Sequence, residues 1–539
     1  MSAGPQIRLP GLILATLAAA AMAWGCNGCN SAAKPPSKSE TPNLRLYLLA
    51  GIAGAIEPCG CVKDMLGGVD HAAAYLAAQT RTVPNQLVVG AGPMLFSDPS
   101  IDADHVKQAE FKAMALAESF RDIGLAAWAP GANDWALGAE RLSEFAKVSG
   151  AKLLAANLKG ATTPFEATAL RSVNGLKVGF AGVVVAGPRP NLPSGLDYES
   201  ARDALTRAQK ALREQGAQLQ VALVAAPRGD ALRLIEQVPG FQLVVLGKPF
   251  DQGENNDEPI PPTIVGNTLA AQAPNHLQGI GSVDLFVRGD DYSFADGTGV
   301  EKLEKKQSLT TRIAELEGGI AEWEKTGANQ RDLAARRDDL KKLREELRAL
   351  DEEAPATEGS FYTYELVDVR ESLGVEPKVK GRLAAYYKRV NQHNREVFKD
   401  KLPPPVPEGE ASYLGVEKCA ACHLEEAAFW KTTRHAKAYE TLVKDDKQFN
   451  LDCVSCHVTG YEKPGGTTVT HVQGLTDVQC ETCHGPGSLH VANPADPKLI
   501  QAVPDRAFCA QACHHPPHVK KDWSVDAAWK HIVGPGHGG

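Results

Sequence analysis

The chain has 539 residues and a mass of 57.4 kDa, which at roughly 100–200 residues per domain predicts two to four domains. Its composition, 43% hydrophobic and 23% charged residues, is that of a globular protein and excludes wholesale disorder or a collagen-like fibre. The formal charge of −8 argues against nucleic acid as a partner. A single long apolar stretch, at the N-terminus, excludes a polytopic membrane protein.

Residues 1–25 have the pattern of an export signal, with Arg8 before an apolar run and small residues before Cys26. This ending resembles a bacterial lipoprotein cleavage site. It implies a lipid on Cys26 and an exported protein, periplasmic or anchored to the outer membrane of a bacterium. An ordinary cleaved signal and an uncleaved anchor are the alternatives. Residues 26–43, which include Cys29, are expected to be a solvated tether.

The region 44–299 alternates short apolar runs with helical patterns, which predicts a layered α/β fold. Strands are expected over residues 44–49, 86–89, 153–155, 177–184, 219–224 and 242–246. Helical stretches are expected to include residues 75–78, 106–123, 139–149, 201–216 and 229–237.

Several phrases in this region resemble the 5′-nucleotidase branch of the calcineurin-type metallophosphoesterases. They are Gly54-Ala-Ile-Glu-Pro-Cys59, Leu66-Gly67-Gly68, Ala155-Ala-Asn-Leu158, Asn174-Gly-Leu-Lys-Val-Gly-Phe-Ala-Gly182 and Pro239-Gly-Phe-Gln-Leu-Val-Val-Leu-Gly247. The resemblance implies a layered fold that binds two metal ions through Asp, His and Asn side chains, with the ions generating the attacking hydroxide.

The metal ligands of that family are missing when they are carried over one position at a time. The positions are Gly51 and Ala53, Pro93, Ala132 and Asn133 (or Asn133 and Asp134), Ala225, and the run Gly247-Lys248-Pro249-Phe250. Because Gly, Ala, Pro and Phe side chains do not coordinate divalent cations, we expect a non-catalytic scaffold. Residual nucleotide phosphoesterase activity is the alternative. Cys59 and Cys61 are interpreted as thiols or a local bridge in a turn, with a soft-metal ligand pair as the alternative.

Residues 300–353 carry two runs of apolar residues at helical spacing, separated by a break at residues 326–329. The runs are Leu309, Ile313, Leu316, Ile320 and Trp323, then Leu333, Leu340, Leu343, Leu347 and Leu350. This pattern predicts a helical hairpin, with a dimerising coiled coil as the alternative. Residues 354–400 are expected to return a strand (361–369) and a helix to the α/β domain. Residues 401–412 then form a proline-rich linker.

The last segment, residues 413–539, holds eight of the twelve Cys and eleven of the fifteen His. Three copies of Cys-x-x-Cys-His and one copy with an extra residue between the cysteines occur there. They are Cys419–Cys422–His423, Cys453–Cys456–His457, Cys480–Cys483–His484 and Cys509–Cys513–His514. From the frequencies of Cys and His in the chain, roughly 0.01 copies of Cys-x-x-Cys-His are expected by chance.

This motif is the signature of covalent c-type haem attachment. The two thiols bind the porphyrin, and the adjacent His (His423, His457, His484 or His514) binds the iron. Zinc is the competing interpretation, but it does not explain why His follows the second Cys every time. The sequence therefore predicts four haem c groups in a mostly helical, loop-rich domain.

The segments CAACHLEEAAFWKTTRHAKAYETL, DCVSCHVTG and VQCETCHGPG resemble the cytochrome c-554-type tetrahaem family. That family shuttles electrons from hydroxylamine oxidation in the periplasm. The resemblance implies His435 as distal ligand of the third haem, His490 of the first, and a late His of the fourth, for which we favour His531 over His537. It implies an open second haem, although His471 is a candidate cap. His515 and His518 are interpreted as surface residues.

The sequence thus predicts a multidomain protein in which a degenerate phosphoesterase-like domain, interrupted by a helical hairpin, precedes a tetrahaem cytochrome domain. The expected function is electron transfer to redox proteins of the cell envelope, with the membrane reached through a lipid anchor. The enzymatic alternative is oxidation or reduction of a small nitrogen or oxygen species at a five-coordinate haem. A homodimer formed through the hairpin is a further expectation.

Overall fold

The computed structural model describes residues 41–58, 65–160, 165–185, 196–250, 256–326, 329–351, 359–515, 518–519 and 523–534. The predicted signal (1–25) and most of the tether lie outside these ranges. Four cysteines and one histidine for which predictions were made also lie outside them: Cys26, Cys29, Cys59, Cys61 and His537.

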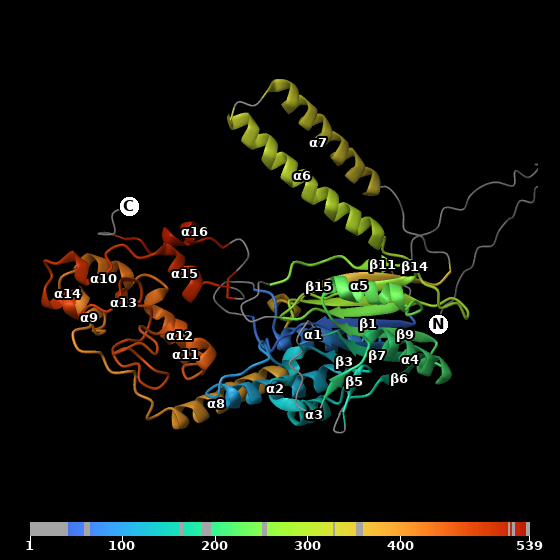
Figure 1. Ribbon diagram of the computed structural model, residues 1–539, viewed down its shortest axis with the longest axis horizontal. Helices are drawn as coiled ribbons and strands as arrows, with labels where there is room; N and C mark the ends of the chain where they lie inside the picture. The colour runs from blue at the N-terminus through green and yellow to red at the C-terminus, as the bar shows by residue number, and fades with distance from the viewer. Residues whose placement is uncertain are drawn as a thin grey trace, which may run out of the picture.

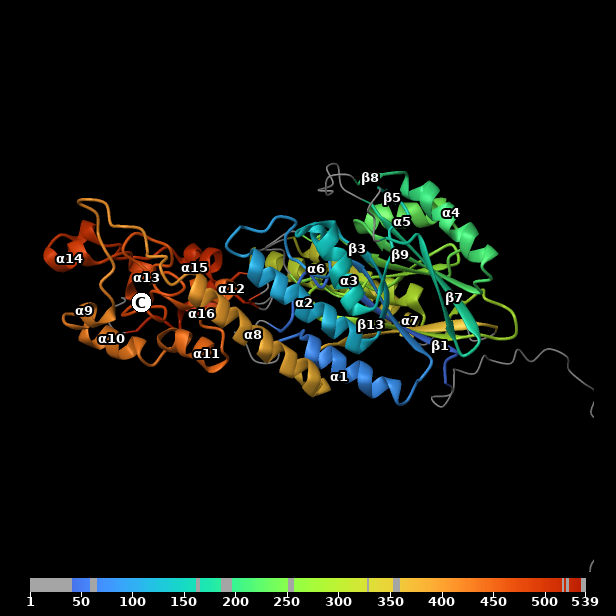
Figure 2. The same ribbon diagram turned by 90° about the horizontal axis from the view of Figure 1, so that it is seen from below.

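The N-terminal part is built on two mixed β-sheets that pack face to face (Figures 1 and 2). The first runs in the order β14 (Ala295–Asp296), β15 (Phe361–Asp368), β13 (Gly279–Phe286), β1 (Leu44–Ala50), β2 (Gln86–Gly92), β3 (Leu125–Pro130) and β4 (Lys152–Leu153). The second runs in the order β11 (Thr263–Val265), β12 (Thr268–Ala271), β10 (Leu243–Gly247), β9 (Leu219–Ala225), β7 (Leu176–Val184) and β6 (Thr168–Val173). A separate pair joins β5 (Leu158–Lys159) and β8 (Asp197–Tyr198).

Helices cover the outer face of each sheet, which gives four layers (Figure 2). The first sheet carries α1 (Val69–Thr80), α2 (Val106–Ile123), α3 (Gly138–Ser149) and α8 (Pro377–Val397), and the second carries α4 (Ala201–Glu214) and α5 (Arg228–Gln237). Strand β7 shows why both faces of the second sheet must be apolar. Its Phe180 belongs to the core between the sheets, whereas Val183 packs under α4 and α5. The predicted layered α/β fold is confirmed.

The two sheets approach most closely where β2 and β10 end. A Cβ atom on Gly247 would lie 2.0 Å from the carbonyl carbon of Ala91, so no larger residue fits at this position. The contact brings the carboxyl ends of β1, β2, β3, β9 and β10 together, which is the edge where the family's metal ligands were expected.

The hairpin consists of α6 (Val300–Thr326) and α7 (Gln330–Asp351) and projects away from the sheets (Figure 1). Ion pairs Lys305–Glu346, Glu317–Arg344 and Glu324–Arg337 show that the two helices run antiparallel. Strand β15 follows the hairpin and pairs with β13 and β14. The expected insertion into the α/β fold is therefore confirmed; dimerisation stays a prediction.

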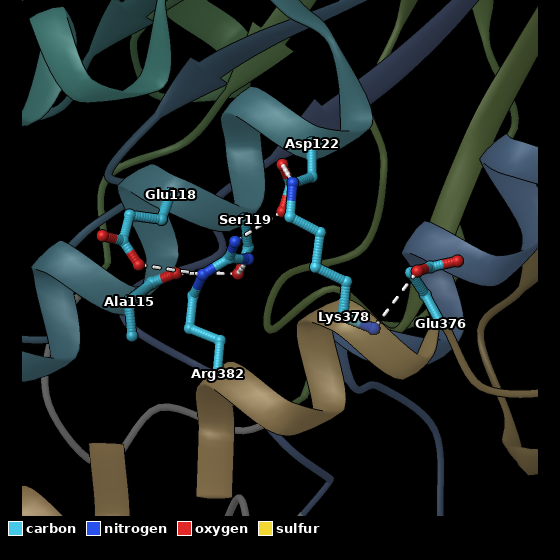
Figure 3. Close-up of polar contacts among 7 residues, drawn as sticks. All are labelled: Ala115, Glu118, Ser119, Asp122, Glu376, Lys378 and Arg382. Carbon is cyan, nitrogen blue, oxygen red and sulfur yellow. Dashed lines mark hydrogen bonds and ion pairs between the residues drawn. The ribbon is translucent and has the colours of Figure 1, made fainter. Parts of the chain in front are cut away.

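Helix α8 is held on α2 by a cluster of charged side chains (Figure 3). Arg382 donates to Glu118 (2.9 Å), Ser119 (3.1 Å) and Asp122 (2.5 Å). Lys378 adds a second ion pair to Asp122 at 2.8 Å. Burial opposes ionisation of Asp122, but Lys378 and Arg382 overcome it and lower the pKa of this carboxyl below its usual value.

The C-terminal part is made of short helices joined by loops: α9 (Val416–Ala420), α10 (Leu424–Trp430), α11 (Ala438–Lys444), α12 (Leu451–His457), α13 (Cys480–His484), α14 (Ser488–Ala492), α15 (Arg506–Ala512) and α16 (Val525–Trp529). Short 3₁₀ turns are η1 (Ala132–Trp135) and η2 (Glu371–Leu373) in the α/β part, and η3 (His435–Lys437) and η4 (Pro497–Leu499) here. A small apolar core formed by Phe398, Leu451, Val454, Val458 and Val469 lies next to the end of α8. Among the helices in the described ranges, none combines the length and the apolar character that a bilayer crossing needs.

The Arg382 cluster yields a stability prediction. Arg382→Ala is expected to lower the free energy of unfolding of the α/β part by about 2 kcal/mol at pH 7, because it removes hydrogen bonds to charged groups. The pKa of Asp122 lies below its ordinary value of 3.8, so the contribution of the ion pairs is complete above that pH. It is lost as the pH falls through the lowered value.

Urea denaturation of wild type and Arg382→Ala, followed by far-ultraviolet circular dichroism between pH 2.5 and 7, measures this difference. A difference between the two proteins that did not shrink toward the acid end would contradict the role of Asp122.

Candidate haem site

Each of the four attachment motifs lies on or directly after a short helix. Cys419 is in α9, Cys453 to His457 in α12, Cys480 to His484 in α13, and Cys509 in α15. A spacing of three and four residues in a helix puts two thiols and an imidazole on one face. None of the eight cysteines of these motifs forms a disulfide.

Cysteines of different motifs lie near one another, close enough for one thiol to shift the pKa of the next. Cys419 of the first motif is in hydrogen-bonding contact with Cys480 of the third. Cys456 of the second is in the same contact with Cys513 of the fourth, and this neighbour lowers the pKa of Cys456 to about 6, with burial opposing it. Cys483 of the third motif lies within electrostatic range of Cys509 of the fourth. The motifs therefore form one cluster in the order first, third, fourth, second.

His423 and His490 form a pair of facing imidazoles. Their ring centres are 6.4 Å apart and their planes differ by 29°. Two imidazoles that bind one metal from opposite sides, each through a nitrogen about 2 Å away, bring their ring centres to about 6 Å. The buried Nδ1 of His490 has no hydrogen-bond partner in the described part of the chain. The geometry of this pair fits a haem iron between the rings.

A second pair of this kind joins His435 to His514, with ring centres 6.2 Å apart and planes at 46°. The resemblance had implied that His435 serves the third haem, whose proximal ligand is His484. The structure instead brings His435 to the proximal residue of the fourth motif. Ligation of the third haem by His435 stays a prediction, and the spacing of the two rings equally suits one metal between His435 and His514. Trp523 stacks on His514 at 4.9 Å.

The remaining two proximal residues have fixed ring orientations. His457 Nδ1 lies 2.6 Å from the carbonyl oxygen of Ala438, and His484 Nδ1 lies 2.8 Å from that of Gln501. A carbonyl only accepts, so each Nδ1 carries the proton and each Nε2 has its lone pair for a metal. Burial lowers the pKa of His457, which favours the neutral form that binds iron.

The two other candidate distal ligands are less well placed. His471 Nδ1 contacts the hydroxyls of Thr468 (3.3 Å) and Thr470 (3.1 Å), and the described residues show no ring contact between His471 and His457. His531 follows α16 and is exposed. Iron ligation by His471 or His531 stays a prediction.

The sequence analysis missed Glu481, which lies between the cysteines of the third motif. Its carboxylate is 2% exposed and accepts backbone hydrogen bonds from Leu414, Gly415 (2.7 Å) and Gly487 (2.8 Å). Gly415 precedes α9, so this one carboxylate ties the first attachment helix to the third. The signal in the sequence was a charged residue within a helix of candidate ligands, but its partner Gly415 is 66 residues away.

The expected metal edge of the α/β part is filled by other groups. The Lys248 ammonium lies 2.8 Å from Asp257, and the Phe250 ring packs on His276 at 4.7 Å. Across the described ranges, no group of three or more His, Cys, Asp or Glu side chains is arranged to hold a metal ion. A paired cation and an aromatic ring therefore lie at positions where the sequence resemblance implied metal ligands.

Two of the expected ligand positions, Asn133 and Asp134, are polar, and both side chains stabilise the local fold. Asn133 donates to the carbonyl oxygen of Phe250 at 3.0 Å. Asp134 accepts from the backbone amides of Met94, Leu95 and Gly131 at 2.8–3.0 Å. Burial raises the pKa of Asp134 to about 7, with these amides opposing the shift. Both side chains are thus engaged in shaping loops.

The C-terminal part thus carries the donor set of covalent haem attachment, and the described ranges of the α/β part show no cluster of metal ligands. Residues 418–485 match the family model described as cytochrome c554 and c-prime. The chain is 41% identical to cytochrome c-554 of Nitrosomonas europaea over 95 aligned positions, which cover 14% of this chain and 40% of that protein. The chain thus spans about two fifths of the length of this curated relative.

The solved structures that resemble the chain are of another kind. A 5′-nucleotidase precursor from Thermus thermophilus shares 17% identity at a TM-score of 0.45, over 67% of this chain and 61% of that one. The sulfate thiohydrolase SoxB from the same species shares 13% identity at a TM-score of 0.43, over 81% of this chain and 74% of that one. The comparisons thus return both families that the sequence resembles.

Glu481 supplies a prediction for the cytochrome domain. Glu481→Ala is expected to destabilise it by at least about 3 kcal/mol, because three backbone amides lose a charged acceptor. Glu481→Gln keeps one carbonyl oxygen and is expected to lose less. Denaturation followed by optical absorption measures the free energy of unfolding of the C-terminal domain in both variants. Equal stability of wild type and Glu481→Ala would show that the hydrogen bonds of Glu481 do not hold α9 and α13 together.

Proposed function

We propose that the protein is an exported c-type cytochrome that transfers electrons through four covalently bound haems. The thioether links would form at the eight cysteines named above, and His423, His457, His484 and His514 would be the proximal ligands. Lipid on Cys26 would anchor the chain to a membrane of the cell envelope, where redox proteins would be its partners.

The thiol cluster is the observation that carries this proposal. Cysteines of neighbouring motifs lie close enough to shift one another's pKa, so haems attached to them would be neighbours and an electron would pass between them over a short distance. A bound haem supplies the one-electron chemistry. The protein's own residues hold the porphyrin edges close together and orient the imidazoles.

The ring pairs support specific axial ligands. We assign His490 to the first iron with His423, and His435 to the fourth iron with His514. The second assignment replaces the pairing of His435 with the third haem and that of His531 with the fourth. Two imidazoles on one iron favour low-spin electron transfer over ligand binding.

The α/β domain serves in this proposal as a non-catalytic scaffold. Its support is the Lys248–Asp257 ion pair at the edge where a divalent cation would bind, since an ammonium repels such an ion. Release of phosphate from a nucleotide after addition of Mn²⁺ or Zn²⁺ would contradict this part of the proposal.

A second candidate function is oxidation or reduction of a small nitrogen or oxygen species at the second haem. It is kept because the two ring pairs above do not include His457; His518, which lies within electrostatic range of His457, is the residue that would close that side. An iron with an open side would bind a small ligand.

The central test is the intact mass of full-length protein matured with cytochrome assembly machinery. We expect four haems per chain, and one fewer in the double variant Cys509→Ser/Cys513→Ser, because each haem needs its own thiols. The same spectrum reports acylation of Cys26. Protein of unmodified mass would refute covalent haem binding altogether.

The axial assignment is tested by electron paramagnetic resonance of the ferric protein. His490→Ala and His435→Ala are each expected to convert one low-spin haem into a high-spin haem, and the double variant two haems, because each loses one strong-field ligand. His531→Ala separates the two candidates for the fourth iron: an unchanged spectrum is expected if His435 is the ligand, and a new high-spin signal would assign that iron to His531. A wild-type spectrum with low-spin signals only would eliminate the open second haem.

A further inference from the structure

Helix α12, which carries the second attachment motif, begins against the α/β domain. Its N-cap residue is Asn450, and the first backbone amides of the helix are among the groups that a helix cannot satisfy itself. Asn450 accepts from the amide of Asp452 at 2.9 Å. Gln108 of α2 accepts from the amide of Leu451 at 3.0 Å. The cap of this helix is thus shared between two domains.

Gln108 is the centre of a fully buried polar network. It is 2% exposed, and its amide nitrogen donates to Asn450 at 3.1 Å. Asn394 of α8, 1% exposed, donates to Gln108 Oε1 at 2.9 Å and to the carbonyl oxygen of Phe449 at 2.8 Å. Asn391 of α8 accepts from the amide of Phe449 at 3.2 Å. Because unpaired buried amides are costly, such a network fixes the position and direction of the helix it caps.

Charged groups surround this junction. Lys112 of α2 pairs with Asp452 of α12 at 2.7 Å, directly before Cys453. Lys447 pairs with Glu57 of the α/β domain at 2.6 Å, and Tyr387 of α8 donates to the same carboxylate at 2.7 Å. Lys112, Tyr387 and Lys447 all lie within electrostatic range of the Cys453 thiol.

The first and third attachment helices are held differently. Glu481 and Gln479, both from the C-terminal domain, bind the backbone before α9, with Gln479 accepting from Val416 at 2.6 Å. Those two helices therefore depend on their own domain, whereas α12 depends on residues about 340 positions earlier in the chain.

We propose that the α/β domain positions the second haem: Gln108 and Asn394 set the direction of α12, and Lys112 sets the charge beside the attachment site. This inference rests on the proposed function, in which Cys453 and Cys456 bind haem. Lys112 compensates the Asp452 carboxylate. Without it, an unpaired negative charge next to the porphyrin favours ferric over ferrous iron, so the potential of that haem falls.

The test compares two lysines that are matched in type and pairing. Lys112 and Lys378 each pair with an aspartate, at 2.7 and 2.8 Å. Lys378, however, lies at the start of α8, away from α12, and its partner Asp122 is on α2. We expect Lys112→Gln to shift one of the four haem potentials downward and to alter one haem signal in the paramagnetic resonance spectrum. Lys378→Gln is expected to change neither, and Lys112→Arg to restore the wild-type values.

Gln108→Leu gives an independent measurement, because it breaks the network without changing any charge. It is expected to alter the spectrum of the same haem that Lys112→Gln affects while the haem count stays at four. Potentials that stay unchanged in Lys112→Gln, or that shift alike for all four haems, would overturn the inference. Absence of covalent haem from wild-type protein would instead refute the proposed function, so the two failures are distinguishable.

Discussion

The capped start of α12 is the contact on which the arrangement of the molecule depends. Four side-chain amides from α2, α8 and the C-terminal domain satisfy one another and the backbone around Phe449 and Leu451. The net gain from each hydrogen bond is small, but a buried amide that loses its partner is costly. The network is therefore satisfied in one orientation of the C-terminal domain relative to α2 and α8. In a rotated orientation, buried amides would lose their hydrogen-bond partners.

This junction requires that α2 and α8 themselves form a rigid surface. Arg382 and Lys378 hold α8 on α2 through Glu118 and Asp122, at the end of α8 that lies away from the C-terminal domain (Figure 3). The apolar residues of both helices belong to the core of the first sheet. The α2–α8 surface of the α/β domain thus supports the C-terminal domain. The hairpin between β14 and β15 does not interrupt this surface.

The edge where the sequence resemblance implied metal ligands is built from other groups in this chain. Gly247 still allows the two sheets to approach at the edge where ligands would meet, but Lys248, Phe250 and Asp257 occupy that edge. The architecture persists because it depends on buried apolar layers, whereas a metal site depends on a few polar side chains. The four attachment motifs all lie in the C-terminal domain.

The sequence by itself determined the layers, the hairpin and the attachment motifs. Residues 106–123 form α2 as predicted, because their apolar spacing is local. It did not reveal β3, a short alanine-rich run with no alternating pattern, which forms a strand because it pairs with β2 and is fully buried. Only the tertiary structure decided that His435 faces His514 and that Gln108 caps α12. These partners are 79 and 343 residues apart, and local spacing carries no information on which distant group a side chain will meet.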